Sequence, residues 1–307
     1  MKTLVVITGP TASGKTALAI EVATRLGCDI ISADSRQIFK GLPIGTATPD
    51  AHQLAVVRHH FVATLPVESY YSAAQYEADV MALLPELFAG SDYAVMCGGS
   101  MMYVDAVTRG IDLLPTISEE TRAHAYGLLH SEGIEAVRHK LAQLDPEYLA
   151  QADPHNHKRL VHALEICLES GVPYSSLRTG EAKKRSFRVM KFAIDMPRDT
   201  LFARINARVD AMIEAGLVEE VRSMLTKRQL NALNTVGYKE MFAYLDGTWD
   251  LATATARMAK NTRVYAKKQL TWLKRDPEVC WLPADTLSTG EMAQKVTDIV
   301  CHSTANT

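Results

Sequence analysis

Several hallmarks of other protein classes are missing from this sequence of 307 residues. Its five cysteines are scattered and odd in number, without a C-x-x-C pair, which argues against a disulfide framework or a zinc site and for reduced thiols. No apolar run approaches membrane-spanning length, and the N-terminus lacks the apolar stretch of a signal peptide. The sequence therefore predicts a cytoplasmic protein without a membrane segment.

An excess of charge of one sign is also missing. The net charge is −2 and the pI is near 6.6, so any surface for nucleic acid must be local. There is no internal repeat or low-complexity tract. The ten histidines include His59-His60 and His155-Asn156-His157, and neither group has a cysteine or carboxylate partner at ligand spacing. With 47% apolar residues and a length typical of about two domains, the chain should be globular with a sizeable core.

The most specific motif is LVVITGPTASGKT at residues 4–16, which matches the phosphate-binding pattern G-x-x-x-x-G-K-[ST]. An apolar strand precedes it and a helical pattern follows it, as this motif requires. Gly9 and Gly14 allow backbone N–H groups to point at phosphate oxygens. Lys15 adds a positive charge, and the Thr16 hydroxyl is a ligand for Mg²⁺. The residues expected to hold phosphate are Gly9, Pro10, Thr11, Ala12, Ser13, Gly14, Lys15 and Thr16.

Short apolar strands alternate with helical segments in the N-terminal part of the chain. Strands are predicted before Gly9, at Ile30–Ile31, at 59–65 and at the start of 92–107, and one of the intervening helices covers 72–89. This alternation predicts an α/β fold, a parallel sheet flanked by helices of the P-loop NTPase type.

The pattern changes near residue 114, where a long helical stretch without an apolar strand begins. A polar loop at 175–186 follows, and then an apolar strand at 187–197 is expected to rejoin the sheet. Helices should fill 198–228 and 250–275, and the tail after Leu282 shows little pattern. We therefore predict a catalytic P-loop core, residues 1–115 and 187–307 with basic helices near its C-terminus, and a mostly helical insertion domain, residues 116–186.

Two predicted strands end in polar residues. Asp34 follows Ile30–Ile31, and because ligands of open α/β sheets bind beyond the carboxyl ends of the strands, it is a candidate to face the phosphate loop. A Mg²⁺ ligand, a general base and a cap of the next turn are all possible roles. Gly98-Gly99-Ser100 marks a second exit, either a ligand contact or a tight turn. Spacing alone does not single out Arg208, which lies on a predicted helix.

Residues 257–275 carry seven lysines and arginines and no acidic residue, with Tyr265 and Trp272 between them. Basic side chains bind phosphates and aromatic rings stack on exposed bases, so this segment favours a nucleic-acid surface. The alternative is a solvated helix face with Trp272 in the core.

Six motifs in order resemble the motif set of the bacterial tRNA dimethylallyltransferases, the IPP transferase family. They are GPTASGKT, ADSRQIFKGLPIGTATP, GGSMMY, KRLVHALE, VGYKEM and TRVYAKKQLTWLK, and the resemblance runs from about Leu4 to Leu282. It implies transfer of the dimethylallyl group from dimethylallyl diphosphate to N6 of adenosine 37, beside the anticodon of tRNA, with release of diphosphate. It also implies Mg²⁺, the anticodon stem-loop as partner, and a monomer without an obligate protein partner.

The resemblance also implies residue roles. Lys15 and Arg208 would hold the diphosphate, on which charge builds as its bond breaks, and Mg²⁺ would bridge it beside Thr16. Asp34 is the implied general base, and Ser100 would position the adenine or the diphosphate. The adenosine must leave its stack to react, and the amide of Gln37 would read its edge. The implied tRNA contacts are Asp34, Ser35, Arg36, Gln37, Ser100, Arg122, Lys158, Arg159, Leu160, Val161, His162, Thr235, Val236, Gly237, Tyr238, Lys239, Lys267, Lys268, Gln269, Trp272 and Lys274.

Three residues depart from the family pattern. Ser100 stands where threonine is usual and Phe39 where tyrosine is common, and His162 replaces an arginine, so that a fixed charge becomes pH-dependent. Other functions compatible with the phosphate loop are a kinase acting on a small molecule or nucleotide, a prenyltransferase acting on free AMP or ATP, and a non-catalytic RNA-binding protein. The helical insert and the basic helix argue against the first two, and Asp34 and Ser100 argue against the third.

Overall fold

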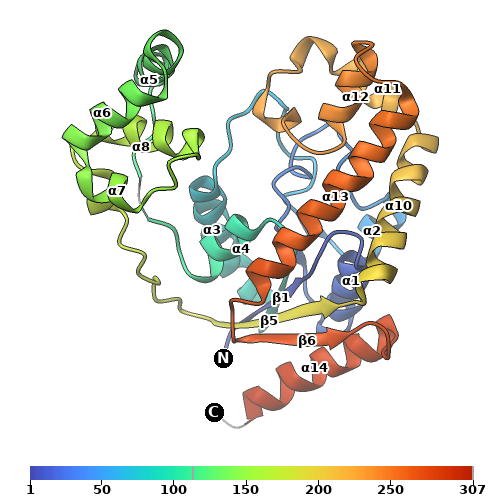
Figure 1. Cartoon of the computed structure of the whole chain (residues 1–307). Helices are drawn as coiled ribbons and strands as arrows, with labels where there is room; N and C mark the ends of the chain where they lie inside the picture. The colour runs from blue at the N-terminus through green and yellow to red at the C-terminus, as the bar shows by residue number, and fades with distance from the viewer. Residues whose placement is uncertain (113, 306–307) are drawn as a thin grey trace. The chain divides into compact units, whose positions relative to one another are not determined.

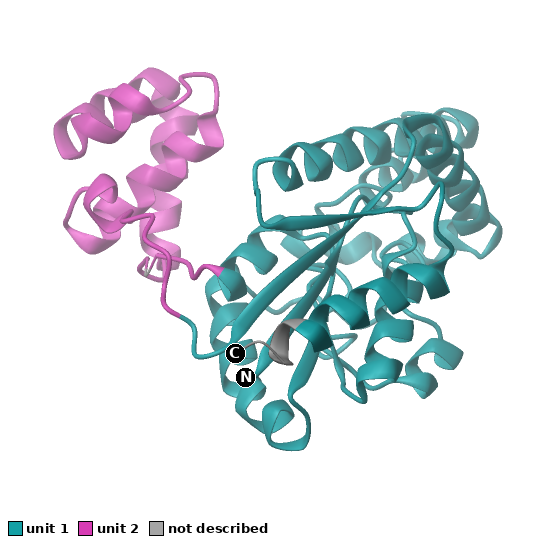
Figure 2. Ribbon diagram, turned by 90° about the horizontal axis from the view of Figure 1, so that it is seen from below, with its two compact units in different colours: residues 1–108, 185–307 teal, residues 109–184 magenta. Residues whose placement is uncertain are grey.

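The computed structural model describes residues 1–112 and 114–305. The chain divides into two compact units, which Figure 2 colours separately. Unit 1 consists of residues 1–108 and 185–307, and unit 2 of residues 109–184. Unit 2 is therefore inserted into the chain of unit 1.

Unit 1 is built on a parallel sheet of six strands in the order β3-β2-β4-β1-β5-β6. The strands are β1 Thr3–Thr8, β2 Ile30–Ser32, β3 His59–His60, β4 Tyr93–Cys97, β5 Arg188–Asp195 and β6 Val279–Pro283. Every residue of β1 is buried, as expected for an inner strand covered on both faces. The predicted α/β class with a parallel sheet is confirmed.

Helices cover both faces of this sheet. On one face α1 and α14 pack through Leu18, Val22 and Val296 against Val5 and Phe192. The opposite face carries α3, α4 and the end of α13, the long orange helix of Figure 1. The bounds of these helices are α1 Lys15–Leu26, α3 Ala73–Gly90, α4 Met101–Thr108, α13 Leu251–Leu273 and α14 Thr289–Ala305. No helix in the described part of the chain is long and apolar enough for a bilayer crossing.

A second group of helices packs with the loop that follows β2. Its apolar core joins Ile38 and Leu42 to Val209, Tyr238 and Met258. Its elements are α10 Arg198–Glu214, α11 Leu217–Ser223, η1 Leu225–Lys227, η2 Asn231–Leu233 and α12 Tyr238–Leu245, with the first half of α13. The short helix α2 Ala51–Val56 contacts α1 instead. Because this loop leaves the carboxyl end of β2, the helical group lies beyond that edge of the sheet.

One prediction about local structure is wrong, and two elements near the C-terminus were not predicted. The strand expected at 59–65 stops after His60, because Phe61 and Ala63 have positive φ angles of 62° and 49°, which break the extended backbone. The tail after Leu282, whose sequence shows little pattern, completes the strand β6 and forms α14. A helical spacing of buried residues at Met292, Val296 and Val300 was present in the sequence and was missed.

Unit 2 is helical, as expected for this stretch. Its core includes Val137, Leu141, Leu160 and Leu164. Three of its helices begin at side-chain caps, which satisfy backbone N–H groups that lack a partner within the helix. The helices are α5 Glu119–Glu132, α6 Ile134–Leu144, α7 Pro146–Gln151, α8 His157–Ser170 and α9 Tyr174–Leu177.

Candidate active site

The order of the strands brings three strand exits together. β4 lies between β2 and β1, so the segments that leave these strands are neighbours. The backbone N–H of Ala33 donates to the carbonyl of Cys97 at 2.8 Å, and that of Gly98 donates to Ile7 at 3.3 Å. The phosphate loop, Asp34 and the turn before α4 therefore meet at one edge of the sheet.

The phosphate loop has the left-handed backbone that its glycines predict. Gly9 has a φ of 141° and Gly14 a φ of 100°, and Ala12 also adopts a positive φ of 64°. A Cβ at Gly9 would come within 3.1 Å of the Ser13 hydroxyl, so glycine keeps the loop closely folded. The N-terminus of α1 follows directly, and its free N–H groups and dipole favour an anion.

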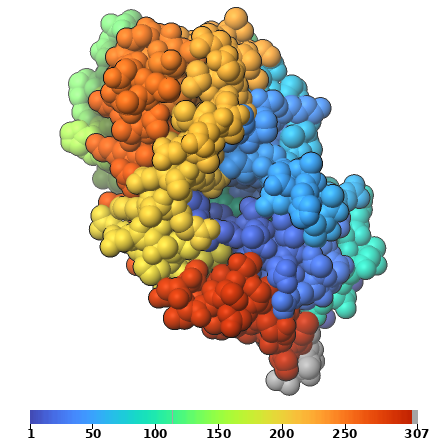
Figure 3. Space-filling model, turned by 90° about the vertical axis from the view of Figure 1, so that its right-hand side faces the viewer, coloured from blue at the N-terminus to red at the C-terminus, as the bar shows by residue number. Residues whose placement is uncertain are grey.

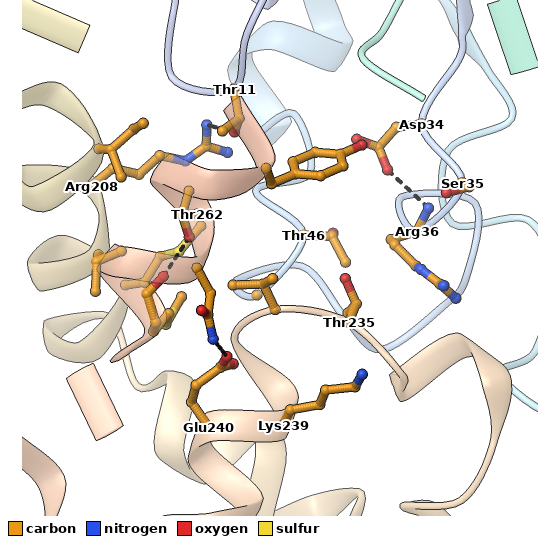
Figure 4. A pocket seen from close by; sticks show the side chains of 18 of the residues that line it. Thr11, Asp34, Ser35, Arg36, Thr46, Arg208, Thr235, Lys239, Glu240 and Thr262 are labelled. Carbon is orange, nitrogen blue, oxygen red and sulfur yellow. Dashed lines mark hydrogen bonds between the residues drawn. The ribbon is translucent and has the colours of Figure 1, made fainter. Parts of the chain in front are cut away.

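Two cations lie at this loop without an ion-pair partner among the described residues. The Lys15 ammonium donates to the carbonyl of Pro10 at 2.8 Å, and burial lowers its pKa to about 8. The Arg208 guanidinium extends toward Thr11, whose hydroxyl accepts a hydrogen bond from it at 3.5 Å (Figure 4), and burial lowers its pKa as well. An anion bound between them would restore the favourable solvation that both cations have lost.

The carboxylate of Asp34 is held by hydrogen bonds from the backbone of the turn that follows it. Its Oδ1 accepts hydrogen bonds from the backbone N–H groups of Arg36 at 2.9 Å and Gln37 at 3.3 Å, the first of which is drawn in Figure 4. Within the described part of the chain, no hydrogen bond ends on its Oδ2. The neighbouring Ser100 hydroxyl accepts from the Ser35 N–H at 2.9 Å and lies 3.1 Å from the Ser35 hydroxyl. Asp34 thus caps the turn and still offers one oxygen to a ligand.

A pocket of about 480 Å³ opens between the strand exits and the helical group of unit 1. Figure 4 shows Thr11, Arg208 and Asp34 at one end, and Lys239 and Glu240 at the other. The apolar wall between them comes from Ile205, Val209, Met212, Val236 and Met258, and the remaining lining residues are Ser35, Arg36, Gly45, Thr46, Ser100, Asn234, Thr235, Asn261, Thr262 and Tyr265. The pocket can therefore hold a charged group and an apolar group side by side.

A second hollow of about 380 Å³ lies on the outer side of the phosphate loop. It is lined by Ala12, Gly14, Lys15, Thr16, Ala17, Gln53, Arg204, Ala207 and Arg208. Figure 3 shows a depression where the yellow surface of α10 meets the dark blue N-terminal residues. The sequence analysis missed Arg204, although it precedes Arg208 by one helical turn and therefore shares its face of α10.

The loop at residues 43–48 forms one wall of the pocket and is held from two sides. The Glu220 carboxylate accepts from the N–H groups of Ile44 at 2.7 Å and Gly45 at 2.8 Å. From the other side, the Gln37 amide nitrogen donates to the carbonyls of Thr46 and Ala47. The group predicted to read adenine is thus engaged inside the chain, and no sequence motif pointed to Glu220.

The segment at 235–239, predicted from the resemblance to contact tRNA, contains both pocket-lining and buried residues. Thr235, Val236 and Lys239 line the pocket. Tyr238 is fully buried and its hydroxyl donates to Glu220 at 2.6 Å, and the Gly237 N–H donates to the Glu240 carboxylate at 2.7 Å. The side chain of Tyr238 therefore supports the wall of the pocket from behind.

The basic helix α13 has an exposed face and a buried face. Its lysines Lys267, Lys268 and Lys274 are exposed. Trp272 is half-buried, packs against a small apolar cluster, and donates from its indole nitrogen to Asp105 at 2.9 Å. Gln269 is only 2% exposed. The cations face solvent while the tryptophan packs inside, which agrees with the alternative of a solvated helix face. Binding of nucleic acid by this face stays a prediction.

The predicted tRNA contacts of unit 2 lie on and beneath α8. Arg122 and His162 flank the buried Glu165, each with a nitrogen 3.4 Å from one of its oxygens. Lys158 and Arg159 are exposed, whereas Leu160 and Val161 belong to the core of the unit. Only the exposed members of this group present side chains to a ligand at the surface.

The donor set at the phosphate loop suits a divalent cation that binds mainly to substrate oxygens. Among the described residues there is no group of three or more His, Cys, Asp or Glu side chains that could hold a metal ion. Thr16, the second residue of α1, supplies a hydroxyl oxygen beside the loop. Mg²⁺ typically takes one or two protein ligands and completes its shell with phosphate oxygens and water. The residues present therefore fit such an ion.

Fold and site together define an α/β P-loop enzyme whose phosphate loop lies beside a carboxylate and an apolar wall. The family described as IPP transferase matches residues 37–276, and the chain belongs to this family.

Similar proteins cover nearly the whole chain. A tRNA dimethylallyltransferase 2 of Parabacteroides distasonis is 49% identical over 93% of this chain and 95% of its own. A tRNA dimethylallyltransferase 1 of Porphyromonas gingivalis is 51% identical over 91% of this chain and 93% of its own. The crystal structure of a tRNA isopentenylpyrophosphate transferase from Bacillus halodurans has a TM-score of 0.71 at 32% identity, covering 98% of this chain and 96% of that one.

Proposed function

We propose that this chain transfers the dimethylallyl group of dimethylallyl diphosphate to N6 of adenosine 37 in tRNA, with diphosphate as the leaving group. Membership of the IPP transferase family supports this activity, as does the name tRNA dimethylallyltransferase of relatives 49% and 51% identical to it. The observation that carries the proposal is the single pocket in which the phosphate loop, Asp34 and an apolar wall meet.

The two ends of the allylic substrate find matching surroundings in this pocket and in the second hollow, which shares Arg208 with it. The diphosphate binds to the N–H groups of the phosphate loop, to Lys15 and to Arg208, where negative charge is stabilised as it develops on the leaving group. The dimethylallyl group packs against Val209 and Met258, which exclude water from the reacting carbon. Arg204, on the outer side of the loop, adds a further positive charge near the diphosphate.

Asp34 takes the proton that the nucleophile must lose. N6 of the adenine forms a bond to the allylic carbon while the bond from this carbon to the diphosphate oxygen breaks, and the diphosphate leaves with the electron pair. The proton passes from N6 to Oδ2 of Asp34, because Oδ1 already accepts two backbone hydrogen bonds. Ser100, whose hydroxyl lies beside the same turn, positions the adenine.

The cation that suits this site is Mg²⁺, which the Thr16 hydroxyl would hold together with oxygens of the diphosphate. When bound, it neutralises part of the charge on the leaving group. Lys15 and Arg208 neutralise the rest, since both are placed at the loop without a carboxylate partner among the described residues.

The tRNA binds to the exposed cations of α13 and to the exposed side chains of α8 in unit 2. Lysines at α13 attract the phosphates of the anticodon stem-loop, and the flipped adenosine enters the pocket. The reaction takes place in the cytoplasm. The catalytic core predicted at 1–115 and 187–307 corresponds to unit 1, residues 1–108 and 185–307, and the insertion domain for tRNA predicted at 116–186 corresponds to unit 2, residues 109–184.

The test is incubation with labelled dimethylallyl diphosphate, Mg²⁺ and tRNA that lacks the modification, beside parallel reactions with free AMP and with ATP plus acceptors. We expect label in tRNA only, and label in AMP, or transfer of phosphate from ATP, would contradict the proposal. The variant Asp34→Asn keeps the Oδ1 acceptor and loses the base, so kcat should fall by about 10²- to 10⁴-fold while tRNA affinity is unchanged. An unchanged kcat would show that another group takes the proton.

A further inference from the structure

The side chain of Gln269 joins three parts of the catalytic unit. Its Oε1 accepts a hydrogen bond from the backbone N–H of Thr11 in the phosphate loop at 2.8 Å. Its Nε2 donates to the carbonyl of Gly99, in the turn before Ser100, at 2.9 Å. With 2% of its surface exposed, the residue has no access to a macromolecule at the surface.

The packing around this amide is close. A Cβ added at Gly99 would overlap the Gln269 amide nitrogen, although the φ of Gly99 is not positive and its backbone would accept alanine. Tyr265, one turn earlier on α13, also donates to the Gly99 carbonyl, at 3.3 Å. The glycine is therefore needed for the approach of the helix and not for backbone conformation.

The contact with Thr11 falls at a sensitive point of the phosphate loop. The next residue, Ala12, has a φ of 64°, a left-handed conformation that costs a residue with a Cβ about 1 kcal/mol. In addition, the Lys15 ammonium, which bonds to the Pro10 carbonyl, is the group expected to turn toward the diphosphate. When Lys15 leaves the Pro10 carbonyl, the hydrogen bond from Thr11 to Gln269 still supports the strained part of the loop.

We infer that Gln269 is a positioning residue for the diphosphate site and not a contact for tRNA. It holds the phosphate loop and the Ser100 turn at a constant distance, so that the diphosphate on the loop N–H groups stays in register with the adenine beside Ser100. The inference rests on the proposed function for the identity of the diphosphate, and it replaces the RNA contact that the resemblance implied at this position. The neighbouring lysines of α13 keep that role.

The experiment compares Gln269→Met, which preserves size and removes both hydrogen bonds, with Lys268→Met on the exposed face of the same helix. Binding of an analogue with sulfur in place of the bridging oxygen of dimethylallyl diphosphate is measured without tRNA, and tRNA binding is measured separately. Gln269→Met should weaken analogue binding about tenfold and leave tRNA affinity unchanged. Lys268→Met should do the reverse.

A second variant, Gly99→Ala, displaces the Gln269 amide without changing residue 269 and should also weaken binding of the analogue. The inference can therefore be tested even if Gln269→Met fails to fold. Weaker tRNA binding with normal analogue binding in Gln269→Met would overturn the inference, and so would normal binding of both ligands in the two variants. Steady-state kinetics should show a higher KM for the allylic diphosphate with an unchanged KM for tRNA. If the wild type binds the analogue but labels no tRNA, the proposed function fails while the role of Gln269 is still tested.

Discussion

Proton uptake by Lys15 should make diphosphate binding depend on pH. Burial lowers the pKa of its ammonium to about 8 in the free protein, and the bound diphosphate, lying against the ammonium, should raise that pKa back toward its ordinary value. Above pH 8 most of the free protein has a neutral Lys15, which must take up a proton when the diphosphate binds. The affinity for diphosphate is therefore greatest below pH 8 and falls above it.

The size of the effect follows from the pKa of about 8. At pH 7 about nine-tenths of the free protein carries the proton, and at pH 9 about one-tenth does, so affinity should fall about tenfold across this range. The terminal phosphate of the ligand, with a pKa of about 6, stays ionised throughout. Burial raises the pKa of the nearby Cys97 thiol to about 12, so this group does not titrate in the same window.

The assay is calorimetric titration with the sulfur-bridged analogue at constant Mg²⁺, in buffers of different ionisation enthalpy. At pH 8 it should report uptake of about half a proton per ligand. In Lys15→Met, affinity should be low and independent of pH. A flat profile for the wild type, or an affinity that rises between pH 7 and pH 9, would refute the argument from Lys15.

Three further outcomes are expected. Replacing Lys267 and Lys268 with alanine should reduce the slope of log affinity for tRNA against log salt by about 1.5, and an unchanged slope would remove α13 from the interface. Arg204→Ala should raise the KM for dimethylallyl diphosphate about three- to fivefold with the KM for tRNA unchanged; equal KM values in variant and wild type would exclude it from the diphosphate site. In Gly98→Ala the new Cβ would overlap the backbone carbonyl of Ala33, so chemical denaturation should show a free energy of unfolding lower by at least about 2 kcal/mol. The matched control Gly90→Ala has open space around it and should stay within about 1 kcal/mol of the wild type.

The features that sequence reasoning found are those with local causes. The phosphate loop was recognisable because glycines at fixed spacing allow the backbone angles now seen at Gly9 and Gly14. Alternating apolar strands and helices predicted the parallel sheet, because each element buries its own apolar face. The stretch at 59–65 misled the prediction, since nothing in its composition announced the positive φ angles of Phe61 and Ala63.

The site required more than local patterns. Asp34 and Ser100 follow different strands, and they meet the phosphate loop because β4 lies between β2 and β1, an order that depends on long-range pairing. Glu220, Arg204 and the apolar wall carry no motif, since their role arises from which helices pack over the strand ends.

Gln269 illustrates this division most clearly. The sequence placed it on a basic helix, and a helical pattern specifies only which residues share a face. Whether the face holding Gln269 meets RNA or the phosphate loop is set by the packing of α13 against Thr11 and Gly99, residues more than 160 positions away in the chain. The sequence determines the chemistry of each side chain, whereas the tertiary structure determines which other residues that side chain contacts.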